Sequence, residues 1–362
     1  MPLPFILAGA AIAAAGYGAK KGYDGYQDKT EANEILETSK GKYERYKVSF
    51  DAINTKTTES LTQLGELQLQ VGEDFKAFRT LAKDLLAKLN ENGEKDIVID
   101  FPQHKLNKID GLALSTTAYL SKVAGAGVAG AAAAYAVYGG VMALAAASTG
   151  TPIAALSGAA AYNAAMAAIG GGSIAAGGFG MAGGAMVLGS VVAAPIIAIA
   201  GWAFASHAED ALNDARKVRD EVNESVEKMK KGGQQLTKTR LYVEQIYAET
   251  NHLYSIFSEY FDNLKYMNQL KESGTELDTI SGDLIQVIEN GYKVATILTD
   301  IITTPLFKPK KDAQGQVVLN EDKVVVIETD SDGMQVLNEL AIQQTLTKAK
   351  AKAKAKADTA QL

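Results

Sequence analysis

Two glycine-rich stretches carry the spacing of a dinucleotide-binding loop. Gly125-Ala-Gly127-Val-Ala-Gly130 and Gly178-Phe-Gly180-Met-Ala-Gly183 both read G-x-G-x-x-G. Such a loop holds a pyrophosphate when a strand precedes it, a helix follows it and an acidic residue about 20 positions later reaches the ribose. No Asp or Glu lies between Val123 and Ala208, and no convincing strand precedes either stretch. We therefore expect no nucleotide cofactor, and we interpret these glycines as residues that let helices pack closely.

Other reactive residue types are absent or scattered. The chain has no cysteine, which excludes disulfides, thiolate nucleophiles and Cys-ligated zinc. His104, His207 and His252 lie far apart, and no H-E-x-x-H or G-x-x-x-x-G-K-[ST] motif occurs. The net charge of -6 argues against a nucleic-acid partner, which would require a basic face. We therefore predict that the protein is not an enzyme and has no catalytic, cofactor-binding or metal site.

The most unusual feature is a long stretch without charge. None of the 86 residues from Val123 to Ala208 is Asp, Glu, Lys or Arg, whereas a membrane helix needs about 20 apolar residues. We predict that residues 106–208 form a Gly/Ala-rich membrane-inserting block. Turn signals at Gly150–Pro152 and Gly170–Ser173 divide the apolar part into three helical pieces. The pieces are Val123–Ser148, a short middle piece Ile153–Ile169, and Met181–Ala205.

The three pieces differ in their expected affinity for lipid. The last piece is rich in Val, Ile and Leu, whereas the first two hold mostly Ala and Gly, which favour insertion weakly. We infer conditional membrane contact, in which the pieces pack on each other in water and rearrange in lipid. Trp202 and Phe204 are expected at the membrane interface and Pro195 at a kink. The expected helix-packing residues are Gly125, Gly127, Gly130, Gly180 and Gly184, the last two of which form a G-x-x-x-G.

Two long arms flank this block. In each arm, residues 29–92 and 208–270, mostly apolar residues recur at alternating spacings of three and four positions. This spacing predicts helices with an apolar seam. Because both arms have about 60 residues, we expect them to pair as an antiparallel coiled coil on one side of the membrane, with an even number of crossings between them. Gly232 and Gly233 fall within the seam of the second arm and are a candidate hinge. The seam of the first arm is Tyr43, Tyr46, Phe50, Ile53, Thr57, Leu61, Leu64, Gln68, Val71, Phe75, Phe78, Ala82, Leu85 and Leu89.

The ends of the chain are less regular. Residues 1–21 form an apolar segment with three interpretations: a membrane anchor, a buried helix, or a cleaved signal, although no Lys or Arg precedes it. Residues 275–304 predict a third bundle helix. Residues 315–345 predict a β-hairpin and an amphipathic helix, and Asp96–Phe101 could add a third strand. The Lys/Ala tail, 346–362, is expected to be solvated and partly helical, with attraction to anionic lipid as the alternative.

The order of these segments resembles the α-helical pore-forming toxins of the haemolysin E type and their tripartite relatives. In that comparison Val123–Ala208 is the membrane head, and Thr30–Asn90 and Ala208–Gln269 are the body helices. The apolipoprotein L proteins have a similar order of helix, apolar hairpin and helix. The resemblance is architectural and covers about residues 3–303. It implies a mostly α fold and membrane insertion, and it assigns no functional residue.

Two functions follow as hypotheses. The first is a pore-forming or membrane-permeabilising protein that inserts its glycine-rich block and oligomerises through its helical seams. The alternative is a resident membrane scaffold or tether whose coiled coil recruits a helical protein partner. Both place the protein at a lipid membrane, either integrally or after secretion in a soluble form, and neither involves a cofactor.

Overall fold

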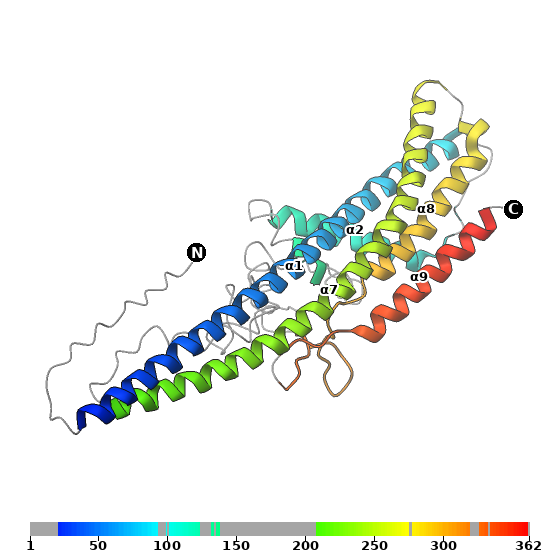
Figure 1. The fold of residues 1–362 in the computed structure, drawn as a ribbon. Helices are drawn as coiled ribbons and strands as arrows, with labels where there is room; N and C mark the ends of the chain where they lie inside the picture. The colour runs from blue at the N-terminus through cyan, green and yellow to red at the C-terminus, as the bar shows by residue number, and fades with distance from the viewer. Residues whose placement is uncertain are drawn as a thin grey trace. The chain divides into compact units, whose positions relative to one another are not determined.

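The computed structural model describes residues 21–92, 99, 101–123, 132–133, 135–137, 208–274, 277–318, 326–331 and 334–360. Within these ranges the chain is mostly helical, which confirms the expected fold class (Figure 1). The predicted N-terminal helix and most of the predicted block, residues 106–208, lie outside the described residues. The helices are α1 (Lys21–Asn92), α2 (Gln103–Val123), α7 (Ala208–Glu272), η3 (Leu277–Ile280), α8 (Ser281–Ile302) and α9 (Glu339–Ala360).

The described residues form two compact units. The first holds the beginning of α1, through Lys56, and the beginning of α7, through Thr237. The second holds the rest of both helices together with α2, residues 132–137 and the chain from Lys238 onward. We call α1 and α7 the stalk helices.

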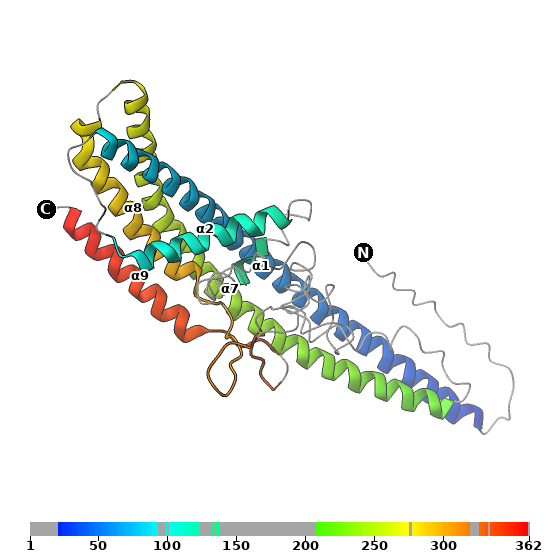
Figure 2. The ribbon, with the colours of Figure 1, turned by 180° about the vertical axis from the view of Figure 1, so that it is seen from behind.

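In the first unit α1 and α7 pack side by side through one apolar seam (Figure 2). Arg216 pairs with Glu31, and Lys42 donates to the Asn223 side chain at 2.7 Å. Farther along both helices, Gly233 faces Ile53. The buried seam between these polar contacts comprises Tyr43, Phe50, Val218, Val222, Val226, Met229 and Leu236.

In the second unit the seam continues into an aromatic cluster. Phe75 and Phe257 meet edge to face with ring centroids 5.0 Å apart, and Phe78 lies 5.9 Å from Phe261. Tyr292 of α8 packs edge to face on Phe78 at 5.3 Å. Such contacts add to the hydrophobic stabilisation that burial of each ring provides. The predicted α1 seam is correct here, because all ten of its positions in this unit are buried: Thr57, Leu61, Leu64, Gln68, Val71, Phe75, Phe78, Ala82, Leu85 and Leu89.

The predicted antiparallel pairing of the arms is wrong. Within the first unit, Glu31 pairs with Arg216 and Lys42 with Asn223, so partner numbers rise together along both helices. The second unit shows the same order, since Asp74 pairs with Tyr254 ahead of the Phe78–Phe261 contact. The stalk helices are therefore parallel. Equal arm lengths fit either direction, and a parallel pair requires the chain between the arms to return to the start of α1.

Helix α2 makes the first part of that return. Asp110 pairs with Arg79, Thr116 lies against Gly72, and Tyr119 and Leu120 pack near Leu69. Partner numbers on α1 therefore fall as α2 advances, so α2 runs antiparallel to α1. Burial raises the pKa of the Asp110 carboxyl, and the neighbouring Arg79 guanidinium opposes that effect only in part.

Helix α8 is the most buried helix of the second unit. Twelve of its residues are buried, including Leu284, Ile288, Leu298 and Ile301. Its buried threonines satisfy their hydroxyls within the helix, as Thr299 donates to the carbonyl of Ala295 at 2.7 Å. This helix lies within the predicted segment 275–304 and ends before Pro305, as expected from the missing proline N–H.

The predicted β-hairpin at 315–345 is not supported. The described residues there contain isolated β-bridges, such as Pro309–Ile327 and Phe307–Leu337, and no strand. Lys308, Glu328 and Val336 form a closed cycle of three backbone hydrogen bonds of 2.8, 2.8 and 2.9 Å. A second such cycle joins the backbone groups of residues 310, 318 and 326. Because each segment bonds two different neighbours in turn, no two-stranded ladder extends.

The remaining strand and helix predictions have mixed outcomes. Asp96–Phe101 lies largely outside the described residues, and neither Ile99 nor Phe101 is in a strand. The final helix, α9, begins at Glu339, later than the predicted amphipathic pattern, and Leu340 is 68% exposed while Ile342 is buried.

Candidate functional site

The described part of the apolar block rests on α1. A Cβ atom added to Gly65 would lie far within 3.0 Å of the Ala132 carbonyl oxygen, closer than real Cβ atoms approach. Because that neighbour is backbone, it has no flexible end that could move aside. Gly65 is therefore needed for this approach, and Ala132 is seated directly on the α1 backbone.

Tyr135 anchors the seated segment. Its side chain is fully buried and its hydroxyl shares a hydrogen bond of 2.7 Å with Thr116 of α2. Its ring lies 5.1 Å from that of Tyr119. Leu69 of α1 and Leu120 of α2 pack in the same cluster. A buried hydroxyl without a partner costs about 1–3 kcal/mol, so the hydrogen bond makes this burial possible.

A second glycine admits α2 to the same region of α1. A Cβ on Gly72 would overlap the side chain of Thr116, which also bonds Tyr135. Gly65, Leu69 and Gly72 thus follow one another at steps of four and three, on a face of α1 distinct from the seam toward α7. We call residues 132, 133 and 135–137, with their contacts on this face and on α2, the docking site of the block.

The predicted membrane residues cannot be placed within the docking site. The eight positions expected to insert or pack helices all lie outside the described residues. The candidate hinge residues Gly232 and Gly233 are buried inside α7, which is continuous through them. A Cβ on Gly233 would lie 3.4 Å from Ile53, an ordinary van der Waals contact, so packing does not require glycine here, and the hinge stays a prediction. The eight positions are Gly125, Gly127, Gly130, Gly180, Gly184, Pro195, Trp202 and Phe204.

Sequence reasoning missed the glycines that matter here. Gly65 and Gly72 stand inside a long helix, where each costs about 1 kcal/mol relative to alanine. Their seven-residue separation beside the apolar seam was a readable signal of a second packing face. Gly291 of α8 is a similar case, because a Cβ there would overlap the ring of Phe78.

The stalk seam also contains buried polar side chains. Gln68 Oε1, Thr239 Oγ1 and Thr250 Oγ1 have no hydrogen-bond partner among the described residues. Leaving a buried acceptor unsatisfied is unfavourable, so these positions reduce the stability of the seam. In coiled coils such polar seam positions set register and partner number at a cost in stability.

No group of three or more His, Asp or Glu side chains in the described ranges could hold a metal ion. None of the helices within those ranges is long and apolar enough to cross a membrane. Comparisons with protein-family models, curated proteins and solved structures found no match. The docking site is therefore the part of the structure that bears most directly on the uncharged block.

Proposed function

We propose that this protein inserts its uncharged block into membranes and permeabilises them. The observation that carries the proposal is the 86-residue stretch without charge, inserted between two long helices with polar outer faces. In water a stretch of that length must be covered, and in lipid it has several times the length that one span needs.

The docking site suggests how the block is held before insertion. Residues 132–137 bury Tyr135 and three neighbours against α1 and α2, although α1 and α2 are ordinary charged helices. In our proposal this contact covers the beginning of the block in water, and its loss frees the block for lipid. The unsatisfied polar atoms in the seam would let the stalk helices exchange partners during assembly.

Liposome leakage tests the proposal. Purified, folded protein is added to dye-filled liposomes over a range of pH and lipid composition, and a carbonate wash then separates inserted from adsorbed protein. We expect dye release together with conversion of a soluble pool into a wash-resistant one. Liposomes that stay sealed under all these conditions would overturn the proposal.

A matched pair of glycine variants links leakage to the docking site. Gly65→Ala places a methyl group against the Ala132 backbone, whereas Gly111→Ala in α2 adds one where no atom lies within 4 Å. We expect Gly65→Ala to displace residues 132–137 and to raise the leakage rate, while Gly111→Ala leaves it unchanged. Equal rates for both variants would show that the docking site does not restrain the block.

A resident membrane scaffold is the second candidate. Large apolar side chains stand exposed on the helices, including Val48 at 69%, Leu114 at 59% and Tyr266 at 58%, and a partner helix could cover them. A scaffold would be wash-resistant in the membrane from the time of synthesis and would not release dye. The same two measurements therefore distinguish the candidates.

A further inference from the structure

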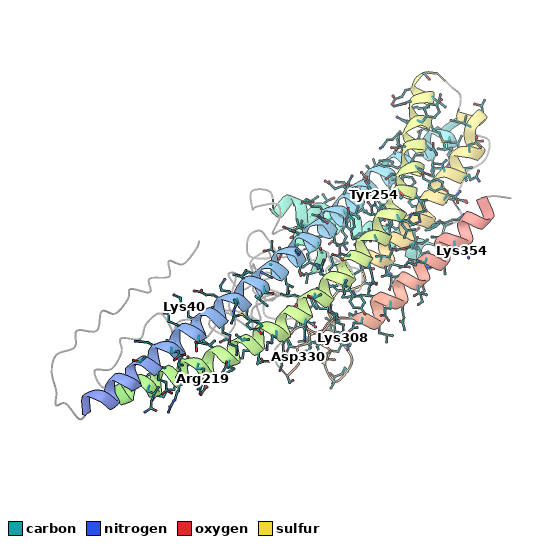
Figure 3. The ribbon with its side chains drawn as sticks, in the orientation of Figure 1. Lys40, Arg219, Tyr254, Lys308, Asp330 and Lys354 are labelled. Atoms are coloured by element: carbon teal, nitrogen blue, oxygen red, sulfur yellow. The ribbon has the colours of Figure 1, made fainter. Side chains whose placement is uncertain are left out.

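Helix α9 carries a run of lysines with no acidic residue next to them in the sequence. From Leu340 to Ala357 the sequence has no Asp or Glu, while Lys348, Lys350, Lys352, Lys354 and Lys356 alternate with alanine. The four lysines whose side chains the structure describes, Lys348 to Lys354, are all exposed. The expected solvated tail is thus a helix whose exposed lysines alternate between its two flanks, with Lys354 near its end (Figure 3).

Lysines on the other helices are arranged differently. Seven of them pair with an Asp or Glu three or four positions away on their own helix, as Lys228 does with Glu224 at 2.7 Å. Such pairs neutralise local charge on a protein whose net charge is -6. The others are Lys47, Lys88, Lys217, Lys230, Lys265 and Lys293.

The helix is fixed in place by its other face. Ile342, Leu346 and Ala349 are buried, and Thr345 shares a hydrogen bond of 3.0 Å with Thr304, which follows α8. Lys352 lies 3.5 Å from Asp300 of α8. At about 100° per residue, Lys348 and Lys354 project away from the buried face and Lys350 and Lys352 flank it.

The beginning of α9 is anchored as well. Glu339 accepts from Lys238 at 2.7 Å and from the hydroxyl of Tyr242 at 2.9 Å. The partner Lys238 lowers the pKa of the Glu339 carboxyl. The lysines are therefore presented by an anchored helix. Because this helix is already ordered, binding to a flat surface would not cost the conformational entropy that a flexible tail would lose.

We propose that the outer side of α9, bordered by Lys348 on one flank and by Lys350 and Lys354 on the other, binds the anionic headgroups of a lipid surface. Lysines near an anionic bilayer each contribute about 1 kcal/mol of attraction. The face offers alternating lysine and alanine without arginine or aromatic side chains, so it lacks the groups that read or stack on nucleic-acid bases. The inference rests on the proposed function in one respect, the choice of a lipid surface as partner.

Vesicle binding by the full chain tests the inference. Co-sedimentation is measured with phosphatidylcholine vesicles and with vesicles that also contain phosphatidylglycerol. The quantity compared is the gain, which is the increase in the vesicle-bound fraction of protein that the anionic lipid causes. The test variant is Lys348→Gln/Lys350→Gln/Lys354→Gln. The control, Lys217→Gln/Lys228→Gln/Lys293→Gln, removes the same charge from lysines that are paired within α7 and α8.

We expect the test variant to lose most of the gain and the control to keep it. At about 1 kcal/mol per lysine, three lysines correspond to a loss of about 100-fold in the partition coefficient. The gain should also fall as salt rises, because the Debye length drops from about 10 Å at 0.1 M to about 3 Å at 1 M. Replacing the same three lysines with arginine should preserve binding.

Three outcomes would overturn the inference: equal loss in test and control variants, no gain from anionic lipid in the unmodified chain, or tighter binding to duplex DNA than to the anionic vesicles. Dye release measured in the same samples separates this inference from the proposed function. Anionic binding without leakage would support the α9 surface and count against pore formation. If the α9 variant leaks dye and binds vesicles as the unmodified chain does, the result would support pore formation and count against the α9 surface.

Discussion

Single atoms decide how closely the apolar block approaches the stalk. At Gly65 the missing Cβ leaves room for the Ala132 carbonyl, and at Tyr135 one hydroxyl finds its partner on Thr116. The two contacts differ in kind, because the first is purely steric and the second satisfies a buried polar group. Together they hold Ala132 and Tyr135 at this place on α1 and α2, and a single methyl group at Gly65 should displace them.

Another tyrosine couples the stalk to alkaline pH. Tyr254 of α7 donates to Asp74 of α1 at 2.5 Å, and burial together with that carboxylate raises the pKa of Tyr254 well above 10.0. A group whose pKa is raised on folding contributes stability that is fully present below its unfolded pKa and is lost as pH rises toward the folded value. We therefore expect the free energy of unfolding to fall above about pH 10.

Tyr254→Phe should make that fall shallower. The variant lacks the titrating hydroxyl, so its denaturant midpoint should change less between neutral pH and pH above about 10. Part of the fall should remain, because burial also raises the pKa of Tyr43 and Tyr292 to about 12. Denaturation curves for both proteins at a series of pH values measure this. Identical pH profiles would show that the Tyr254 hydroxyl is neither buried nor bonded to Asp74 in solution.

At the scale of one helix, the seam of α1 combines apolar layers with a polar one. Gln68 is buried at 3% exposure, and its Oε1 has no partner among the described residues. Gln68→Leu should raise the free energy of unfolding by about 1 kcal/mol, because it removes an unsatisfied acceptor and adds apolar burial. Chemical denaturation measures the change.

The matched control is Gln63→Leu on the exposed side of the same helix. Gln63 is exposed, so its replacement should change stability by no more than about 0.5 kcal/mol. Destabilisation by Gln68→Leu would mean that the amide makes a contact that the seam requires. A change of the same size in both variants would mean that helix propensity, rather than the seam, is responsible.

The stalk seams were predictable because their period is a local property of the sequence. Alternating steps of three and four keep one side of a helix apolar whatever lies opposite, so the buried positions of α1 could be read directly. The end of α1 at Asn92 was equally local, since Gly93 follows it. These features depend on the segment itself and not on its partner.

Features that depend on two distant segments were not predictable in the same way. The direction of pairing is set by where α2 takes the chain, and the seam repeats alone are satisfied by either direction. The valine-rich segments 316–319 and 324–327 suggested a ladder, but Val318 and Val326 each bond a third segment through Lys310. The docking site was missed because its two glycines, Gly65 and Gly72, make room for residues more than 40 positions away in the sequence.

At the scale of the whole molecule, the parallel direction of the arms is the feature most open to a direct test. Because the chain has no cysteine, introduced cysteines can carry spin labels at chosen sites without background. Lys42→Cys/Asn223→Cys places labels where the parallel structure brings the side chains together, at 2.7 Å in the unmodified chain. Pulsed electron–electron double resonance should then report a short distance between the two spin labels.

An antiparallel pair of equal arms would give a very different value. Lys42 would then face the later part of α7, and residue 223 would lie farther along by on the order of 50 Å, at 1.5 Å per helical residue. A long distance in solution would therefore contradict the parallel stalk. Repeating the measurement with liposomes extends the test to the proposed function, since exchange of stalk partners during insertion should lengthen the distance in the wash-resistant fraction. A distance that stays short in inserted protein would mean that the block enters lipid while this part of the stalk remains paired.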